Sequence, residues 1–144
     1  LEQRSEEAFL TCPICLAKGT LIDTPGGLIA VEELEEGMSV WTRDAEGYRR
    51  VVPVLRTSMT PVPGEHKVVH LQLSDGREVY ASPGHLTFDN RTLGMLHIGD
   101  GLDGAAVTTA DLVLYGGEFT YDLLPGGDTG SYWANGILLK TTLL

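Results

Sequence analysis

The sequence is poor in cysteine, in basic residues and in long apolar runs, and each shortage excludes a class of protein. Two cysteines cannot form a disulfide framework. Ten Lys and Arg against twenty Asp and Glu give a formal net charge of −10, which argues against binding phosphate backbones or anionic membranes. No apolar stretch approaches the roughly 18–20 residues that span a bilayer. We expect a monomer of one domain, with no nucleic-acid or membrane partner.

The chain is rich in the turn-forming residues glycine and proline. Eighteen Gly and seven Pro divide its 144 residues into short apolar segments, which is typical of an all-β domain with many turns. The expected strands are Thr20–Asp23, Leu28–Ala30, Ser39–Thr42, Arg49–Thr57, His66–Leu73, Glu78–Ala81, Ala106–Leu114, Phe119–Leu124, Tyr132–Ala134 and Ile137–Lys140. The only helical signal is "VEELEEG" (31–37), one or two turns that Gly37 ends.

Two short motifs bear on how these strands are arranged. The "NG" pair at 135–136 lies between two apolar runs and predicts a β-hairpin. The segments "LEEGMSV" (34–40) and "LHIGDGL" (96–102) share the pattern Leu-x-x-Gly-x-x-(Val/Leu). This echo allows two similar β half-domains folded around each other.

The two cysteines, Cys12 and Cys15, form a CxxC pair with three possible interpretations. A structural zinc site needs four N or S ligands, yet no further cysteine exists, and only His66 and His70 have finger-like spacing. A thioredoxin-type couple opens a helix, whereas the segment that follows here is typical of a strand. The remaining interpretation is a single working thiol, Cys15.

A cysteine nucleophile needs partners that handle its protons and polarise its substrate. The segment "ASPGHLTF" (81–88) supplies candidates, because Ser82 precedes His85 by three residues on a Pro-Gly turn. A hydroxyl and an imidazole at this spacing can reach the same substrate atom. For His85 taken alone, a loop histidine hydrogen-bonded to its own turn is the favoured interpretation, so the case for a catalytic role depends on the whole pattern.

Several blocks together resemble the Hint domain, the self-processing module of hedgehog proteins, inteins and bacterial intein-like proteins. "CLAKGTLIDTPGGLIAVEELEEGMSVWT" is similar to the opening block, which begins with the nucleophilic cysteine. "LSDGREVYASPGHLTF" is similar to the block carrying Thr-x-x-His, and "LGMLHIGDGL" to the Leu-x-x-Gly-Asp block after it. "FTYDLLPGGDTGSYWANGILLK" resembles the final block. The resemblance implies a horseshoe-like, pseudo-symmetric all-β fold with little helix.

The resemblance also implies a reaction, an N–S acyl shift. Cys15 would attack the carbonyl of Ile14 and convert the Ile14–Cys15 peptide bond into a thioester. Ser82 and His85 would hydrogen-bond the scissile amide, twist it or protonate its leaving nitrogen, which offsets amide resonance. Asp122, in the position of the family's Tyr-Asp-Leu motif, would take the thiol proton or stabilise the tetrahedral intermediate. No cofactor or metal enters this scheme.

The chain departs from the family pattern at its downstream end. Inteins close with His-Asn, but this chain has Lys140 and Thr141 there, and Asn135 belongs to the predicted hairpin turn. We therefore expect cleavage without full splicing, with the thioester resolved by water, a thiol or an amine. Hedgehogs activate a sterol with an aspartate in the long strand, where this chain has Arg56 or Thr57.

These inferences divide the chain in two. Residues 1–14 are expected to be an upstream flank and the substrate of the reaction, and residues 15–144 the Hint domain. Because the chain starts at Leu1 rather than at a methionine, we expect it to be a piece of a longer precursor. Two alternatives remain open: a Hint-fold structural or interaction module whose active site has decayed, and a processing domain gated by a disulfide between Cys12 and Cys15.

Overall fold

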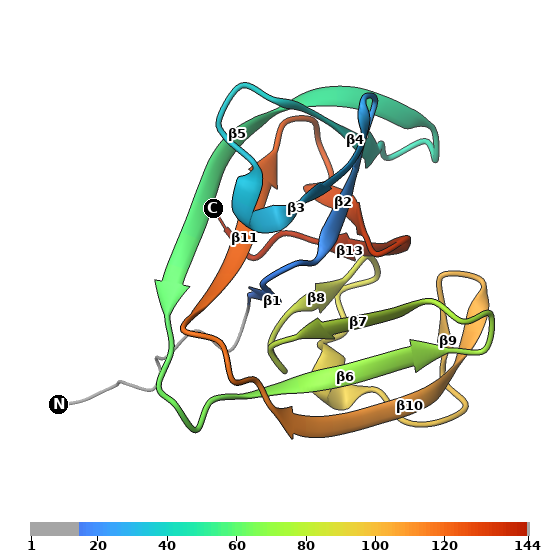
Figure 1. The fold of residues 1–144 in the computed structure, drawn as a ribbon. Helices are drawn as coiled ribbons and strands as arrows, with labels where there is room; N and C mark the ends of the chain where they lie inside the picture. The colour runs from blue at the N-terminus through green and yellow to red at the C-terminus, as the bar shows by residue number, and fades with distance from the viewer. Residues whose placement is uncertain (1–14, 144) are drawn as a thin grey trace, which may run out of the picture.

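The computed structural model describes residues 15–143 as thirteen β-strands and two short 3₁₀ turns (Figure 1). The predicted upstream flank lies outside the described residues. The elements are β1 (Leu16–Ala17), β2 (Leu21–Thr24), β3 (Gly27–Ala30), η1 (Val31–Glu33), β4 (Ser39–Arg43), β5 (Arg49–Pro61), β6 (Lys67–Leu73), β7 (Glu78–Ala81), β8 (Leu86–Thr87), η2 (Leu93–Met95), β9 (Gly101–Leu102), β10 (Ala105–Leu114), β11 (Phe119–Pro125), β12 (Ser131–Ala134) and β13 (Ile137–Lys140). The expected all-β class is confirmed.

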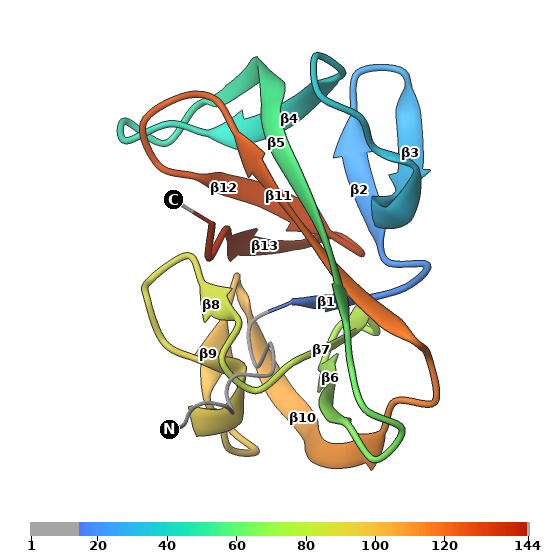
Figure 2. The same ribbon diagram turned by 90° about the vertical axis from the view of Figure 1, so that its left-hand side faces the viewer.

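The strands form two antiparallel sheets. The larger has the order β4-β5-β11-β1-β7-β6-β10-β9, and the smaller has the order β3-β2-β12-β13-β8. The long strands β5 and β11 run from one half of the molecule to the other, and β1 lies between the halves (Figure 2). Strand β1 thus has β11 on one side and β7 on the other, so the start of the described chain is held in the middle of the fold.

Alternating apolar positions build the core, as the sequence pattern predicts. On β6, Val69, Leu71 and Leu73 are buried, whereas His70 and Gln72 between them are partly exposed. The same core includes buried side chains from both sheets. Because strands from both halves contribute to one apolar interior, the halves form a single packed unit.

The sequence echo at 34–40 and 96–102 is confirmed as a repeated local structure. Each copy follows a 3₁₀ turn, η1 or η2, and each has a glycine with positive φ, +92° at Gly37 and +97° at Gly99. The Gly37 N–H donates to the Val54 carbonyl at 2.9 Å, and the Gly99 N–H donates to the Val107 carbonyl at 2.8 Å. The two copies therefore turn the chain by the same device.

The structure corrects two expectations about local elements. The helical signal at 31–37 forms only the three-residue η1, because Gly37 carries the positive φ of a turn. The strand expected directly after Cys15 is divided into β1 and β2 by a turn at Lys18 and Gly19. The φ angle of Gly19 in this turn is +86°. Strands β1, β8 and β9 contain two residues each, too few to produce a readable sequence pattern.

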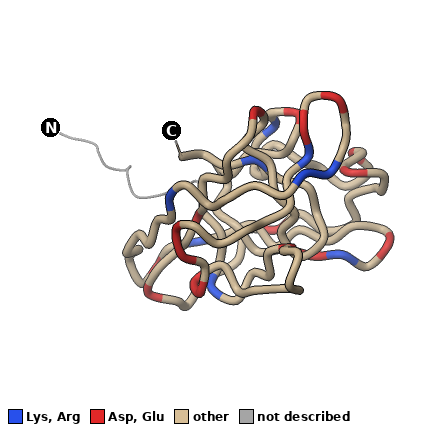
Figure 3. Tube along the Cα trace, turned by 90° about the horizontal axis from the view of Figure 1, so that it is seen from above, with Lys and Arg blue, Asp and Glu red and all other residues tan. Residues whose placement is uncertain are grey.

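Charged residues lie mostly on loops and near the ends of strands. In the view of Figure 3, Lys and Arg are interspersed with Asp and Glu rather than gathered in one patch. Arg77 illustrates this, because its guanidinium bonds the carboxylates of Asp75 and Asp103. Within residues 15–143, no helix is both long and apolar enough to cross a membrane.

Candidate active site

Strand register brings three of the predicted site residues into one row. In β1, Leu16 pairs with Tyr121 of β11 and with Ala81 of β7. Continuing both registers by one residue places Cys15 between Asp122 and Ser82, and the Ser82 N–H donates to the Cys15 carbonyl at 2.8 Å. Directly opposed residues of antiparallel strands present their side chains on the same face of the sheet.

Cys15 is buried, with 1% of its surface exposed. Its sulfur is disulfide-bonded, so it does not titrate as a thiol in this state. The two residues with which the sequence predictions connect it, Ile14 across the scissile bond and Cys12 as redox partner, lie outside the described residues. The roles of all three stay predictions.

The Ser82–His85 segment forms a tight turn that faces the interior. The His85 N–H donates to the Ser82 carbonyl at 3.0 Å, and the His85 carbonyl accepts a hydrogen bond from the Leu93 N–H at 3.0 Å. Both side chains are fully buried. Pro83 and Gly84 between them allow the chain to reverse, so both side chains enter the same interior region.

His85 is joined to Asp122 through a tyrosine. The Tyr132 hydroxyl lies 2.8 Å from His85 Nε2 and donates to Asp122 Oδ1 at 2.7 Å. All three side chains are at most 1% exposed. Burial and the nearby Asp122 carboxylate raise the pKa of Tyr132 well above its ordinary value, so this hydroxyl keeps its proton.

Within residues 15–143, the Asp122 carboxylate receives four donors. Besides Tyr132, its Oδ1 accepts from the Leu123 N–H at 2.8 Å. Its Oδ2 accepts from the Thr142 N–H at 3.1 Å and from the Thr142 hydroxyl at 2.8 Å. Asp122 is thus a buried acceptor at which β11, β12 and the segment after β13 meet.

A second histidine reaches the site from the other side. His66 Nε2 lies 3.2 Å from the Ser82 hydroxyl, and the His66 ring packs edge-on against Tyr115. Burial lowers the pKa of His66, because the charged imidazolium loses the water that would stabilise it. The sequence predictions considered His66 only as a zinc ligand and did not single out Tyr132 at all. Neither residue stands in a recognisable motif; only the folded strands bring them to Ser82 and His85.

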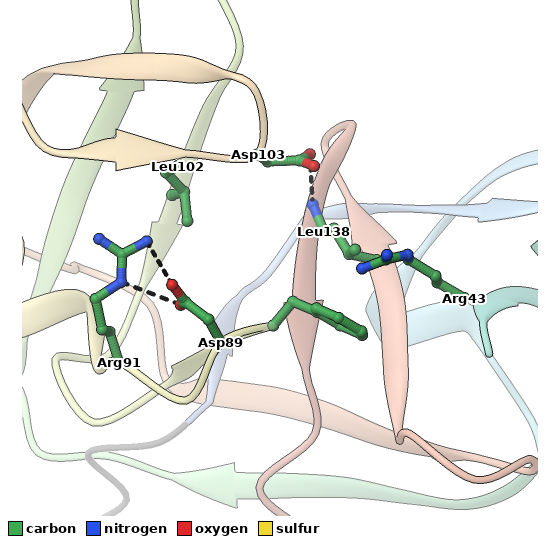
Figure 4. A pocket seen from close by; sticks show the side chains of 7 residues that line it. Arg43, Asp89, Arg91, Leu102, Asp103 and Leu138 are labelled. Atoms are coloured by element: carbon green, nitrogen blue, oxygen red, sulfur yellow. Dashed lines mark hydrogen bonds and ion pairs between the residues drawn. The ribbon is translucent and has the colours of Figure 1, made fainter. Parts of the chain in front are cut away.

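No metal centre is evident among residues 15–143, where no group of three or more His, Cys, Asp or Glu side chains is arranged to hold an ion. A separate cavity of about 170 Å³ is drawn in Figure 4. Its charged groups already have partners, since Asp89 pairs with Arg91 and Asp103 accepts from the Leu138 N–H. The residues that line this cavity do not include Cys15, Ser82 or Asp122.

The comparisons with known proteins agree with this architecture. A bacterial intein-like domain from Clostridium thermocellum superposes with a TM-score of 0.76 at 21% identity, over 89% of this chain and 99% of that one. A DnaB intein from Synechocystis superposes with a TM-score of 0.67 at 22% identity, over 90% and 99%. The gp41-1 intein gives 0.70 at 20% identity, over 88% and 98%. No curated protein sequence matches the chain significantly.

These structural likenesses show the fold, and a sequence match to the family goes further. Residues 14–101, well over half of the chain, match the Hint domain family. That stretch begins one residue before Cys15 and includes Ser82 and His85. The chain therefore belongs to the Hint domain family, whose fold it has and whose members include intein-like autoprocessing domains.

Proposed function

We propose that the domain cleaves its own chain at the Ile14–Cys15 peptide bond through a thioester, without full splicing. The observation that supports this most is the row formed by strand register, Asp122–Cys15–Ser82, with His85 on the adjoining turn. A thiol, a hydroxyl, an imidazole and a carboxylate in one buried region are the groups that an acyl shift needs.

The proposed reaction has two stages, an acyl shift within the chain and transfer of the acyl group to an external nucleophile. The Cys15 sulfur forms a bond to the Ile14 carbonyl carbon while the thiol proton passes to a base. Collapse of the tetrahedral intermediate then breaks the C–N bond, and His85 returns the proton to the leaving nitrogen. Water, a thiol or an amine finally takes the acyl group and regenerates the Cys15 thiol. The Ser82 hydroxyl contributes by hydrogen-bonding the scissile amide.

The oxidation state of Cys15 sets a condition on this reaction. A sulfur in a disulfide cannot attack a carbonyl, and Cys15 is disulfide-bonded in the structure. We therefore propose that processing requires reduction, in line with a gate formed by Cys12 and Cys15. Ile14 adds a second restraint, because its β-branched side chain crowds the carbonyl under attack.

Intact mass spectrometry tests the proposal, using the whole chain with a reporter fused upstream of residue 1. The protein is reduced with a phosphine, which opens disulfides without attacking thioesters, and is then treated with hydroxylamine. The reporter with residues 1–14 should be released as a hydroxamate. Cys15→Ala and His85→Ala should abolish release, and Cys12→Ala should release the reporter without the reductant. An unchanged mass for the folded, reduced protein would instead support the structural or interaction module with a decayed site.

A further inference from the structure

His66 has no role in the proposed reaction, yet its ring lies against a group that the reaction uses. In the part of the chain that the structure describes, the hydrogen-bond partner of the Ser82 hydroxyl is His66 Nε2, at 3.2 Å. We infer that His66 is a positioning residue that holds the Ser82 hydroxyl in its working orientation toward the scissile amide. This inference rests on the proposed function in one respect, the role of Ser82.

The argument starts with what the backbone leaves open at Ser82. Its N–H donates to the Cys15 carbonyl at 2.8 Å, and its carbonyl accepts from the His85 N–H at 3.0 Å. These bonds fix the place of the Ser82 Cβ, but the side chain can still turn among three staggered rotamers. The contact with His66 selects the rotamer that brings Oγ to Nε2. The hydroxyl keeps its other bonding positions for the scissile amide.

The His66 imidazole is itself held in place. The His66 N–H donates to the Pro63 carbonyl at 3.0 Å, and the His66 carbonyl accepts from the Tyr115 N–H at 3.0 Å. The ring packs edge-on against the Tyr115 ring, with centroids 6.3 Å apart. Both the backbone and the ring of His66 are therefore fixed relative to Tyr115.

Tyr115 connects this support to the two strands that form the row. Its hydroxyl accepts from the N–H of Lys18, directly after β1, at 2.8 Å. The same hydroxyl donates to the carbonyl of Phe119, the first residue of β11. Because β1 and β11 also place Cys15 and Asp122, the imidazole that contacts Ser82 is fixed relative to the other groups of the site.

Burial keeps the ring in a form that suits this contact. It lowers the pKa of His66, so the imidazole is neutral at about pH 7. A neutral imidazole offers one N–H and one lone pair, and a hydroxyl can bond either of them. The role that we infer for His66 is therefore the same for both tautomers.

Two replacements separate the ring nitrogen from the ring. His66→Gln keeps a group that both donates and accepts hydrogen bonds, and removes the aromatic ring. His66→Phe keeps a ring against Tyr115 and removes the nitrogen. His97→Phe is the matched control, because the side chain of His97 is 86% exposed.

The first measurement is the rate of reporter release by hydroxylamine from the reduced whole chain. His66→Phe should slow release roughly threefold to tenfold, the effect of one lost hydrogen bond, while His66→Gln and His97→Phe stay close to the wild-type rate. In the slower Ser82→Ala background, His66→Phe should cause no further loss, because no hydroxyl is left to position.

Three results would overturn the inference: a wild-type rate for His66→Phe, equal slowing by His66→Phe with and without the Ser82 hydroxyl, or faster release by His66→Phe than by His66→Gln. The last result would show that ring packing, not the nitrogen, is what the site needs.

The second measurement does not depend on activity. In the reduced whole chain labelled with ¹⁵N-histidine, the His66 ring signals are identified by their loss in His66→Gln. Ser82→Ala should shift the His66 Nε2 signal, and Ser39→Ala, at an exposed position of β4, should not. An unchanged His66 signal in Ser82→Ala would contradict the inference even if His66→Phe folds poorly. If the wild type releases nothing, the proposed function fails, and the spectra still decide whether His66 and Ser82 are coupled.

Discussion

The polar side chains of the site are buried and hydrogen-bond to one another. Ser82, His85, Asp122 and Tyr132 are all at most 1% exposed. Burying a polar group without a partner costs about 1–3 kcal/mol, more for a charge. The hydrogen bonds of Asp122 and Tyr132 offset that cost and also fix the positions of both side chains, so the same contacts serve stability and geometry.

Asp122→Ala should therefore destabilise the protein strongly. The substitution leaves the Leu123 N–H, the Tyr132 hydroxyl and both Thr142 donors without their acceptor. We expect a loss of about 3–5 kcal/mol in the free energy of unfolding, measured by urea titration. Asp111→Ala, on exposed β10, should change it by less than about 0.5 kcal/mol. Equal losses for the two variants would show that the Asp122 contacts contribute nothing.

The lowered pKa of His66 should make the stability of the protein depend on pH. Its pKa is lowered by burial in the folded state, so below the unfolded value near 6.5 the unfolded chain binds more protons than the folded one. Stability should thus fall as the pH falls through and below that value. Urea titrations between about pH 5 and pH 7 should show a shallower fall for His66→Gln than for the wild type. A steeper fall in the variant would contradict the sign of the shift.

The sequence motifs point to four candidate site residues but not to the side chains that surround them. Cys15, Ser82, His85 and Asp122 are identifiable because each stands in a short motif, and their catalytic roles stay predictions. Tyr132 and His66 were not identified because their contacts depend on tertiary pairing: Tyr132 comes from the hairpin β12–β13, and His66 precedes β6. A buried tyrosine in an apolar strand has no local pattern that marks it as a partner of a distant histidine.

On the scale of elements, one side chain links the two sheets. The Arg49 guanidinium on β5 lies over the Trp41 ring of β4 and the Trp133 ring of β12, at 4.6 Å from each centroid. It also bonds Asp23 on β2 at 2.9 Å. Strands β4 and β5 belong to the larger sheet, and β2 and β12 to the smaller. The cation thus connects the two sheets.

Arg49→Ala should lower the free energy of unfolding by about 1–2 kcal/mol, because both cation–π contacts and the ion pair are lost. Arg49→Lys should recover only part of this, since an ammonium cannot stack flat between two indole rings. Urea unfolding followed by tryptophan fluorescence measures both variants. Arg56→Ala, an exposed arginine on the same strand, is the control and should be near neutral. If Arg49→Ala matches this control, the contact between the sheets contributes no stability.

Element prediction succeeded where the apolar pattern was long enough. The strands Glu78–Ala81 and Ile137–Lys140 were predicted with the observed bounds, and the Asn135-Gly136 turn was confirmed, with positive φ at both residues. The prediction ended β5 too early, at Thr57. Beyond that point β5 still pairs with β11, but partly buried Ser58 and Thr60 alternate with exposed Met59 and Pro61, so the segment has no apolar pattern. Long-range pairing, not local preference, holds that part of the strand.

On the scale of the whole molecule, we expect the two repeated turns to contribute similarly to the free energy of unfolding. An added Cβ at Gly37 or Gly99 would meet no atom within 4 Å, so Gly37→Ala and Gly99→Ala cost only the strain of positive φ. Each should lower the free energy of unfolding by about 1–2 kcal/mol, by similar amounts, and the double variant should give their sum. Chemical denaturation measures all three. Clearly unequal single effects would show that the two halves do not use the turn in the same way.

The pairing of Leu16 with Tyr121 joins residues that ribosomes make far apart in time. Strand β1 is synthesised first, yet the partner that holds Cys15 beside Asp122 appears only when most of the domain exists, and Tyr132 follows later still. At 5–20 residues per second, this delay is on the order of ten seconds. The proposed chemistry therefore cannot start in a growing chain, and an unfinished domain cannot cleave the peptide bond before Cys15.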